Sequence, residues 1–234
     1  MDGSRLSLLG RFSCERHGRP LETPFGMQRL LAFLGLRGPS HRCLIAGSLW
    51  PEVPEQQALA SLRTAVWRTK RLAPGLLRVE GDGMHLSSTT WVDSAALEQA
   101  VGVVLDSKPV DESVAGILCQ PELLSGWYDD WVVFERERLN QLRLHALEVA
   151  AQRFIEKQRL DLALRLALEA VRTEPLRETA NAVLMSVYLA EGNVSDAIHQ
   201  YGMFRALLRR ELDLEPSSRL AKLLPERKRT LTPT

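Results

Sequence analysis

The sequence predicts a mostly α-helical fold with a small β part, organised as two domains. Strand signals are confined to residues 1–92, and the remainder reads as helices, in which two clear copies of a repeat lie 34 residues apart while residues 93–135 can hold degenerate helices. The 234 residues suit about two domains, since one domain typically takes about 100–200 residues. A hydrophobic content of 45% and a charged content of 25% are ordinary for a globular protein, which argues against wholesale disorder.

Short antiparallel strands are expected first. Leu6, Leu8 and Phe12 fit strand-like runs, and His17-Gly18-Arg19-Pro20 is a turn signal. A helix then opens at Thr23-Pro24, with Thr23 as a plausible N-cap and Pro24 at the first helical position. Its apolar side holds Phe25, Leu30, Leu31, Phe33 and Leu34, and Gly35 and Gly38-Pro39 end it.

Two more helices and a hairpin complete this part. Ser40 can cap a helix over 41–50, which stops at Trp50-Pro51, and a third helix runs from about 55 to 72. The runs LLRVE and MHLSS flank Gly81-Asp82-Gly83, with Val79 and Leu86 in alternating patterns, as in a β-hairpin. Strands, three helices and a hairpin in this order predict an N-terminal winged helix-turn-helix domain over residues 1–92.

The helical remainder contains an internal repeat. Small and aromatic residues recur 34 positions apart: Phe154 with Tyr188, Ala163 with Ala197, and Ala167 with Tyr201. Alanines let paired helices approach closely, and aromatics fill the space between them, so this period predicts a C-terminal all-α tetratricopeptide-like domain over residues 93–226. Two departures are the missing glycine at Gln158 and the missing proline at Arg209. Residues 227–234 are expected to form a frayed polar tail.

Charge is distributed unevenly although the net charge is +1. Residues 1–92 hold 12 Lys/Arg and 7 Asp/Glu, a balance of +5, whereas residues 93–234 hold 18 and 22, a balance of −4. A basic domain joined to an acidic one suggests two tasks, one of which can involve an anionic polymer. Random surface composition is the alternative explanation.

The third predicted helix separates two faces. On a helical projection its core stripe is Ala58, Leu59, Leu62, Ala65, Val66, Thr69, Leu72 and Ala73. Opposite lie Ala60, Thr64, Trp67 and Arg71, flanked by Arg63, Arg68 and Lys70. No acid lies between Gln56 and Arg71, whereas a merely solvated face would mix both signs. This face is therefore the candidate surface for double-stranded DNA.

Roles for the candidate residues follow from their chemistry. Small Ala60 and Thr64 permit close approach to a major groove, Arg71 can reach a phosphate or a guanine edge, and Thr64 or Trp67 can touch a thymine methyl. Arg63, Arg68 and Lys70 would hold phosphates. Arg78 or His85 would lie beside the backbone from the hairpin. Arg42 would stand near a phosphate at the start of the second helix.

Each role has a plainer alternative. Trp67 can pack on the hairpin instead of touching DNA. Arg63 can pair with Glu55 or another acid. Arg78 and His85 can be ordinary solvated strand residues, and His41 reads as a surface residue.

Other classes of site find little support. Cys14, Cys43 and Cys119 are widely spaced and odd in number, which argues against a disulfide framework or a thiolate zinc site and favours small buried residues in a reducing compartment. No metal or cofactor site is expected. No apolar run approaches the length of about 20 residues that spans a membrane, so we expect a cytoplasmic, nucleoid-associated protein without membrane contact.

An enzyme is not expected. The sequence holds no phosphate-binding loop, nucleophile elbow or zinc-protease motif. Asp129 and Asp130, beside Trp127 and Trp131, could be mistaken for a carboxylate site, but helix capping is the commoner use of Asp at such a place.

A family resemblance covers nearly the whole chain. Residues 5–92 resemble the winged-helix output domain of OmpR/PhoB-type two-component regulators, through RLLAFLGL, LIAGSLWP, SLRTAVWRTKRL and EGDGMHL. Residues 93–224 resemble the bacterial transcriptional activation domain, through LLSGWYDDWVVFERERLNQLRLHALE and ELDLEPSSRL. In this order the two are similar to the Streptomyces antibiotic regulatory protein (SARP) family. Related wings usually carry an aromatic residue where this chain has Met84.

The resemblance implies a DNA-binding activator of a secondary-metabolite or similar gene cluster, which binds direct repeats near promoters and recruits RNA polymerase. It also implies head-to-tail self-association on DNA. The competing hypothesis is a helical scaffold or adaptor that binds proteins and has only non-specific affinity for nucleic acid.

Overall fold

The computed structural model describes residues 3–225, and the predicted tail at 227–234 lies outside this range. By its internal contacts the chain divides into two compact units, which are described separately. The first extends to Ala100 and includes Gln120–Asn140; the second comprises Val101–Cys119 and the chain from Gln141 onward. The division falls within two helices, α4 (Asp93–Leu105) and α6 (Asp130–Glu156). The boundary expected between residues 92 and 93 stays a prediction.

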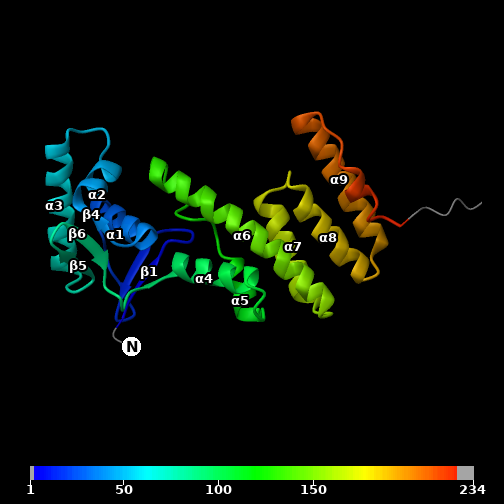
Figure 1. Ribbon diagram of the computed structural model, residues 1–234, viewed down its shortest axis with the longest axis horizontal. Helices are drawn as coiled ribbons and strands as arrows, with labels where there is room; N and C mark the ends of the chain where they lie inside the picture. The colour runs from blue at the N-terminus through cyan, green and yellow to red at the C-terminus, as the bar shows by residue number, and fades with distance from the viewer. Residues whose placement is uncertain (1–2, 226–234) are drawn as a thin grey trace, which may run out of the picture. The chain divides into compact units, whose positions relative to one another are not determined.

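The first unit contains the predicted order of strands, helices and hairpin (Figure 1). Its elements are β1 (Ser4–Ser7), β2 (Ser13–Arg16), β3 (Arg19–Pro20), α1 (Phe25–Arg37), β4 (Ser40–His41), α2 (Arg42–Leu49), α3 (Glu55–Leu72), β5 (Leu77–Glu80), β6 (Gly83–Leu86) and β7 (Trp91–Val92). One sheet has the order β3-β2-β1-β7, with β1 antiparallel to β2 and parallel to β7. The other has the order β4-β6-β5 and is antiparallel throughout.

Three details of this unit correct the sequence analysis. Helix α1 begins at Phe25, so Pro24 and not Thr23 occupies the N-cap position, and no side chain caps the helix. Ser40 does not cap α2; it pairs with Met84 in β4, and His41 takes the cap position. Gly35 does not end α1, which continues to Arg37 and ends at Gly38 with a φ of 68°.

Gly35 has a packing role inside α1. A Cβ atom there would lie 3.0 Å from Leu6 Cδ2 and 3.2 Å from Leu8 Cδ1. The missing side chain therefore lets α1 lie close against the chain at and after β1.

The segment after α5 (Glu112–Leu118) completes the core of the first unit. Leu123, Leu124, Trp131, Val132 and Leu139 belong to the same buried cluster as the α1 leucines. The Arg136 guanidinium donates to the carbonyl oxygens of Leu123 and Leu124 at 2.7 and 2.6 Å, which satisfies backbone acceptors in this irregular stretch.

The second unit is built of paired helices. It contains α5, the later part of α6, α7 (Leu160–Thr173), α8 (Glu178–Ala190), α9 (Val194–Leu212) and the short α10 (Ser218–Ala221). In Figure 1, α7, α8 and α9 follow one another side by side, and α8 contacts both neighbours. No strand follows Val92 within the part of the chain that the structure describes.

The residues that recur at 34 positions lie where the helices of the second unit pack together. Phe154, Ala163, Ala167 and Ala197 are buried, and Tyr188 and Tyr201 pack against the core that Met185, Phe204 and Leu208 form. At the first departure from the repeat, Gln158 adopts the left-handed conformation (φ 59°) that a glycine would take there. At the second, α9 runs through Arg209 to Leu212.

Candidate nucleic-acid interface

Helix α3 has the two faces that its sequence predicts. Ala58, Leu62, Ala65 and Thr69 are buried, and the helix packs against α1 and α2. The Thr69 hydroxyl donates to the carbonyl oxygen of Ala65 at 2.8 Å, so this buried polar group is satisfied. Leu72 is a correction, because it was assigned to the core stripe but is 39% exposed in the last turn.

The opposite face of α3 is exposed and holds every residue that the sequence predicted for this face. Its exposed members are Ala60, Arg63, Thr64, Trp67, Arg68, Lys70 and Arg71. Within residues 3–225, none of these four cations forms a salt bridge, so the pairing of Arg63 with Glu55 is absent. Unpaired arginine and lysine side chains on one face keep their charge available for phosphates.

Trp67 and Arg71 interact with each other on this face. Trp67 is 57% exposed, and the Arg71 guanidinium carbon lies 5.2 Å from the centroid of its ring. A guanidinium over an indole is held by a cation–π interaction while its N–H groups remain free to donate. Trp67 can thus orient Arg71 toward a ligand.

Trp67 also borders a hollow between α3 and the hairpin. The hollow encloses 360 Å³, and Val79 and Met84 line it from the hairpin side. Trp67 therefore lines this hollow and is at the same time 57% exposed, which leaves it accessible to a ligand.

The Thr64 hydroxyl already uses its proton in a hydrogen bond within α3. It donates to the carbonyl oxygen of Ala60 at 3.1 Å. The donor is thus used within the helix, and the methyl group and the oxygen lone pair remain for contacts outside it.

The hairpin has the register of a wing that faces α3 on one side. Val79 pairs with Met84 and Leu77 with Leu86, and Met84 is only 6% exposed. Met84 therefore belongs to the inner face, so the residue that departs from the family pattern packs the hairpin onto the domain. Arg78 is exposed, and its cross-strand partner His85 has its Nε2 3.5 Å from a Glu80 carboxylate oxygen.

Arg42 is tied to the tip of the hairpin. Its Nε lies 2.9 Å from Asp82 Oδ1, one terminal nitrogen donates to the carbonyl oxygen of Gly81 at 3.0 Å, and its backbone N–H donates to the Asp82 carbonyl at 3.0 Å. Asp82 was not among the residues predicted from the sequence. The sequence does contain a signal for its role, because Asp82 is an acid at the centre of the Gly81-Asp82-Gly83 turn in a basic domain.

Asp129 has a structural partner. Its carboxylate forms an ion pair with Arg29, whose guanidinium carbon lies 5.8 Å from the ring centroids of both Phe25 and Trp50. The carboxylate next to α6 thus helps to anchor the segment to α1.

The cysteines match expectation in part. Burial raises the pKa of the Cys14 thiol to about 11, and burial also raises the pKa of Cys119. Cys43, in the first turn of α2, is exposed, which corrects the expectation that all three are buried. All three thiols are free. Among the helices described, none has a stretch long and apolar enough to cross a bilayer.

Residues 118–226 match the family described as "Bacterial transcriptional activator domain". Over 238 residues the chain is 30% identical to "Regulatory protein AfsR" of Streptomyces coelicolor, which covers 94% of this chain and 24% of that protein. It is 28% identical over 249 residues to "Regulatory protein AfsR" of Streptomyces griseus, covering 95% and 24%. The chain therefore spans about a quarter of the length of these curated relatives.

The fold is also found in a solved structure. Mycobacterium tuberculosis EmbR, in complex with a low-affinity phosphopeptide, superposes with a TM-score of 0.74 at 21% identity, over 95% of this chain and 64% of that chain. This likeness confirms the predicted fold class of a winged helix with a helical domain. Both curated relatives are named as regulatory proteins. Sequence motifs, fold and relatives agree in their likeness to the SARP family, in which a winged helix is followed by a bacterial transcriptional activator domain.

Proposed function

We propose that this regulator is a sequence-specific DNA-binding activator and that the exposed face of α3 enters the major groove. The observation that carries the proposal is a run of four exposed cations without any salt bridge in residues 3–225, on the face opposite the buried stripe. Ala60 and Thr64 are small, so the helix backbone can approach the groove floor.

Base reading is assigned to the centre of this face. Arg71, oriented by Trp67, can donate two hydrogen bonds to a guanine edge, and the Thr64 methyl group can contact a thymine methyl. Arg63, Arg68 and Lys70 flank the centre and would hold phosphates, joined by Arg78 from the hairpin. Arg42 contributes by holding the hairpin tip at Asp82.

A selection of binding sites from random double-stranded DNA tests the base-reading roles. Arg71→Ala should relax preference at one position, because losing a good base contact costs about 1–3 kcal/mol against the preferred site. Thr64→Ala should do so more weakly. Arg172→Ala, an exposed cation paired with Glu169 in the helical unit, is the matched control and should return the unchanged motif. An unchanged motif from Arg71→Ala would rule out its base contact.

We further propose that copies bind direct repeats head to tail and recruit RNA polymerase at promoters of a biosynthetic gene cluster, in the cytoplasm on the nucleoid. A basic winged helix can abut the acidic helical domain of a neighbouring copy, and such a heterologous contact extends along DNA. Half-sites about 10–10.5 base pairs apart place both copies on one side of the duplex.

Inserting about five base pairs between the half-sites, half a helical turn, tests this arrangement. The insertion turns one copy to the opposite side, so cooperative binding should be lost while each half-site keeps its own affinity. Unchanged cooperativity would exclude the head-to-tail arrangement. Sequencing of DNA cross-linked to the full chain in cells identifies the target genes.

A further inference from the structure

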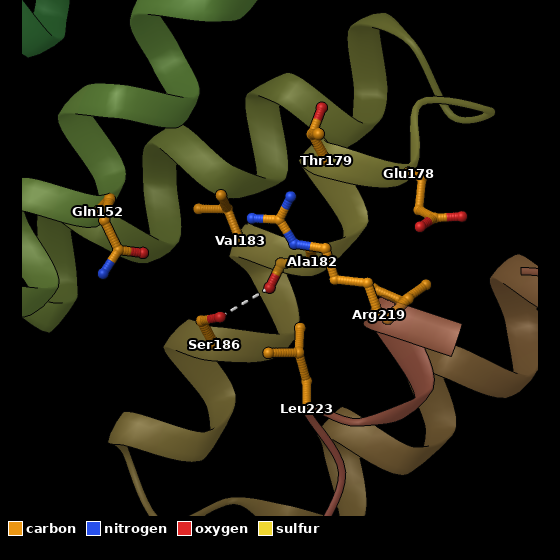
Figure 2. Close-up of a pocket in the computed structure, with 9 residues that line it drawn as sticks. Gln152, Glu178, Thr179, Ala182, Val183, Ser186, Arg219 and Leu223 are labelled. Atoms are coloured by element: carbon orange, nitrogen blue, oxygen red, sulfur yellow. Dashed lines mark hydrogen bonds between the residues drawn. The ribbon is translucent and has the colours of Figure 1, made fainter. Parts of the chain in front are cut away.

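The second unit contains a hollow that the DNA-binding proposal does not use. It encloses 330 Å³ and is lined by residues of α6, α8 and α10 and by Leu223 after α10 (Figure 2). This volume is at the small end of ordinary ligand pockets, which are about 300–1,000 Å³.

The floor of the hollow is apolar. Ala182 and Val183 form it from α8, and Leu220 and Leu223 form it from α10 and the residues after it. Leu220 is 1% exposed and belongs to the core around Phe204, so the floor is continuous with the packed interior. Such a floor favours an apolar side chain over water.

Arg219 stands over this floor on an anchored turn. Ser217 caps α10 by accepting from the Leu220 N–H at 3.3 Å, and its own N–H donates to Glu178 Oε2 at 2.9 Å. The Ser217 hydroxyl hydrogen-bonds the other Glu178 oxygen. Both carboxylate oxygens of Glu178 thus hold α10 in place, which fixes the backbone that carries Arg219.

The Arg219 guanidinium has no acid of its own. Across residues 3–225 no salt bridge includes Arg219, although Glu178 lines the same hollow. In Figure 2 the guanidinium extends across the face of α8 toward Val183, and the Glu178 carboxylate lies on the other side. In the same unit Arg172, Arg177 and Arg205 are each paired with a glutamate.

Gln152 adds a polar group at the α6 wall. Its side-chain amide has both a donor and an acceptor, and it makes no hydrogen bond within the described part of the chain. The N–H and C=O of one residue in an extended segment point to the same side and are complementary to this pair. A free carboxylate offers only acceptors.

We propose that this hollow binds an extended peptide segment of a partner protein, which carries a carboxylate side chain next to an apolar one. Arg219 takes the carboxylate in a two-pronged hydrogen bond, the α8 and α10 floor takes the apolar side chain, and Gln152 pairs with the peptide backbone. The site does not depend on DNA reading by α3, so the two proposals can fail separately.

Selection of phage-displayed random heptapeptides on the full chain tests the proposal. We expect a consensus of Asp or Glu beside Leu, Ile, Val, Met or Phe. Arg219→Glu should convert the acidic position to Lys or Arg while keeping the apolar one. Lys222→Glu makes the same charge change one turn later, outside the lining, and should return the original consensus.

The selected peptide is then synthesised with a fluorescent label and measured by anisotropy. Replacing its carboxylate by the amide should weaken binding about tenfold or more, since a charge-assisted hydrogen bond is lost. Arg219→Glu should weaken it at least as much, and Lys222→Glu should leave it within about twofold. Melting curves and DNA affinity of both variants should match those of the parent chain.

Three results would overturn the proposal. One is a selection without any consensus. Another is an unchanged consensus from Arg219→Glu. The third is tighter binding of free octanoate than of the peptide, measured by competition, which would make the hollow a small-molecule site.

Discussion

Arginines on α3 and arginines in the helical unit differ in what surrounds them. In the helical unit three arginines each lie next to a glutamate. The distances are 2.6 Å from Arg177 Nε to Glu148 Oε1, 2.7 Å from Arg172 Nη2 to Glu169 Oε1, and 2.5 Å from Arg205 Nε to Glu215 Oε2. On α3, Arg68 and Arg71 have no such partner anywhere in residues 3–225. A phosphate must compete with a neighbouring carboxylate in the first case and only with water in the second. Local pairing thus decides which cations are available to DNA.

The largest expected effect is on stability, and it comes from removing the acid of the Glu148–Arg177 ion pair in the helical unit. Glu148 is 8% exposed and accepts from Arg177 and from the Thr179 hydroxyl, the latter at 2.7 Å. Glu148→Ala should lower the free energy of unfolding by about 1.5–3 kcal/mol, because hydrogen bonds to a charged group are lost in a largely buried place. Chemical denaturation measures this change.

Glu215→Ala is the matched control, since Glu215 pairs with Arg205 in an exposed position. It should leave the denaturation midpoint unchanged. Equal destabilisation by both substitutions would show that burial does not separate the two pairs.

The next effect concerns unpaired cations on α3. Arg68→Ala and Lys70→Ala should each weaken binding to all DNA sequences alike and reduce the slope of log affinity against log salt by about 0.9, since one fewer phosphate is neutralised. Stability should not change, because both side chains are exposed and make no salt bridge within the described residues. A titration at several salt concentrations gives the slope, and Arg172→Ala is the control. A changed base preference with an intact slope would contradict the phosphate role.

A smaller effect separates two roles for Arg42, the paired cation of the DNA-binding unit. If Arg42 acts by holding the hairpin tip, Arg42→Ala and Asp82→Ala should each weaken DNA binding up to about fivefold, the range of an exposed salt bridge. The double variant should be no weaker than either single one.

If Arg42 instead contacts a phosphate directly, Asp82→Ala should strengthen binding by removing a competing acid. Affinities of the four proteins for one DNA site distinguish these outcomes.

The smallest effect concerns the Asp93 carboxylate, which backbone N–H groups hold. Asp93 accepts from the Leu8 and Leu9 N–H groups at 2.7 and 3.0 Å, yet burial raises its pKa above the ordinary value of about 3.9. A raised pKa in the folded state means that the protonated form is favoured there. Its stabilising contribution is present below about pH 4 and is lost as the pH rises through the raised value.

Asp93→Asn removes this titration. The melting temperature of the variant, relative to the parent chain, should therefore rise between pH 4 and pH 7. A constant difference across this range would show that Asp93 does not titrate there.

Patterns set by one helix or one hairpin were predictable. The exposed residues of α3 followed from 100° per residue and from the missing acids. The hairpin register followed from alternation around two glycines. The predictions for Thr23, Ser40 and Leu72 were wrong, because a cap competes with strand pairing and burial at a helix end depends on what packs there.

Contacts between distant segments were not predictable. The buried cluster of the first unit gains members from a stretch far along the chain, namely Leu123, Leu124, Trp131, Val132 and Leu139. Arg42 meets Asp82 across 40 positions, and Glu148 meets Arg177 across 29. Charge patterns along a chain do not show which acid a given arginine will reach.

By itself the sequence determined the two kinds of architecture, the 34-residue repeat and the acid-free face of α3, because these depend on residue spacing within single elements. Only the tertiary structure decided which cations remain unpaired, that Met84 faces inward, and that Arg219 stands over an apolar floor while Glu178 is occupied by Ser217. The physical reason is that ion pairing and burial are set by distances across folded segments, and these distances follow from how the segments pack.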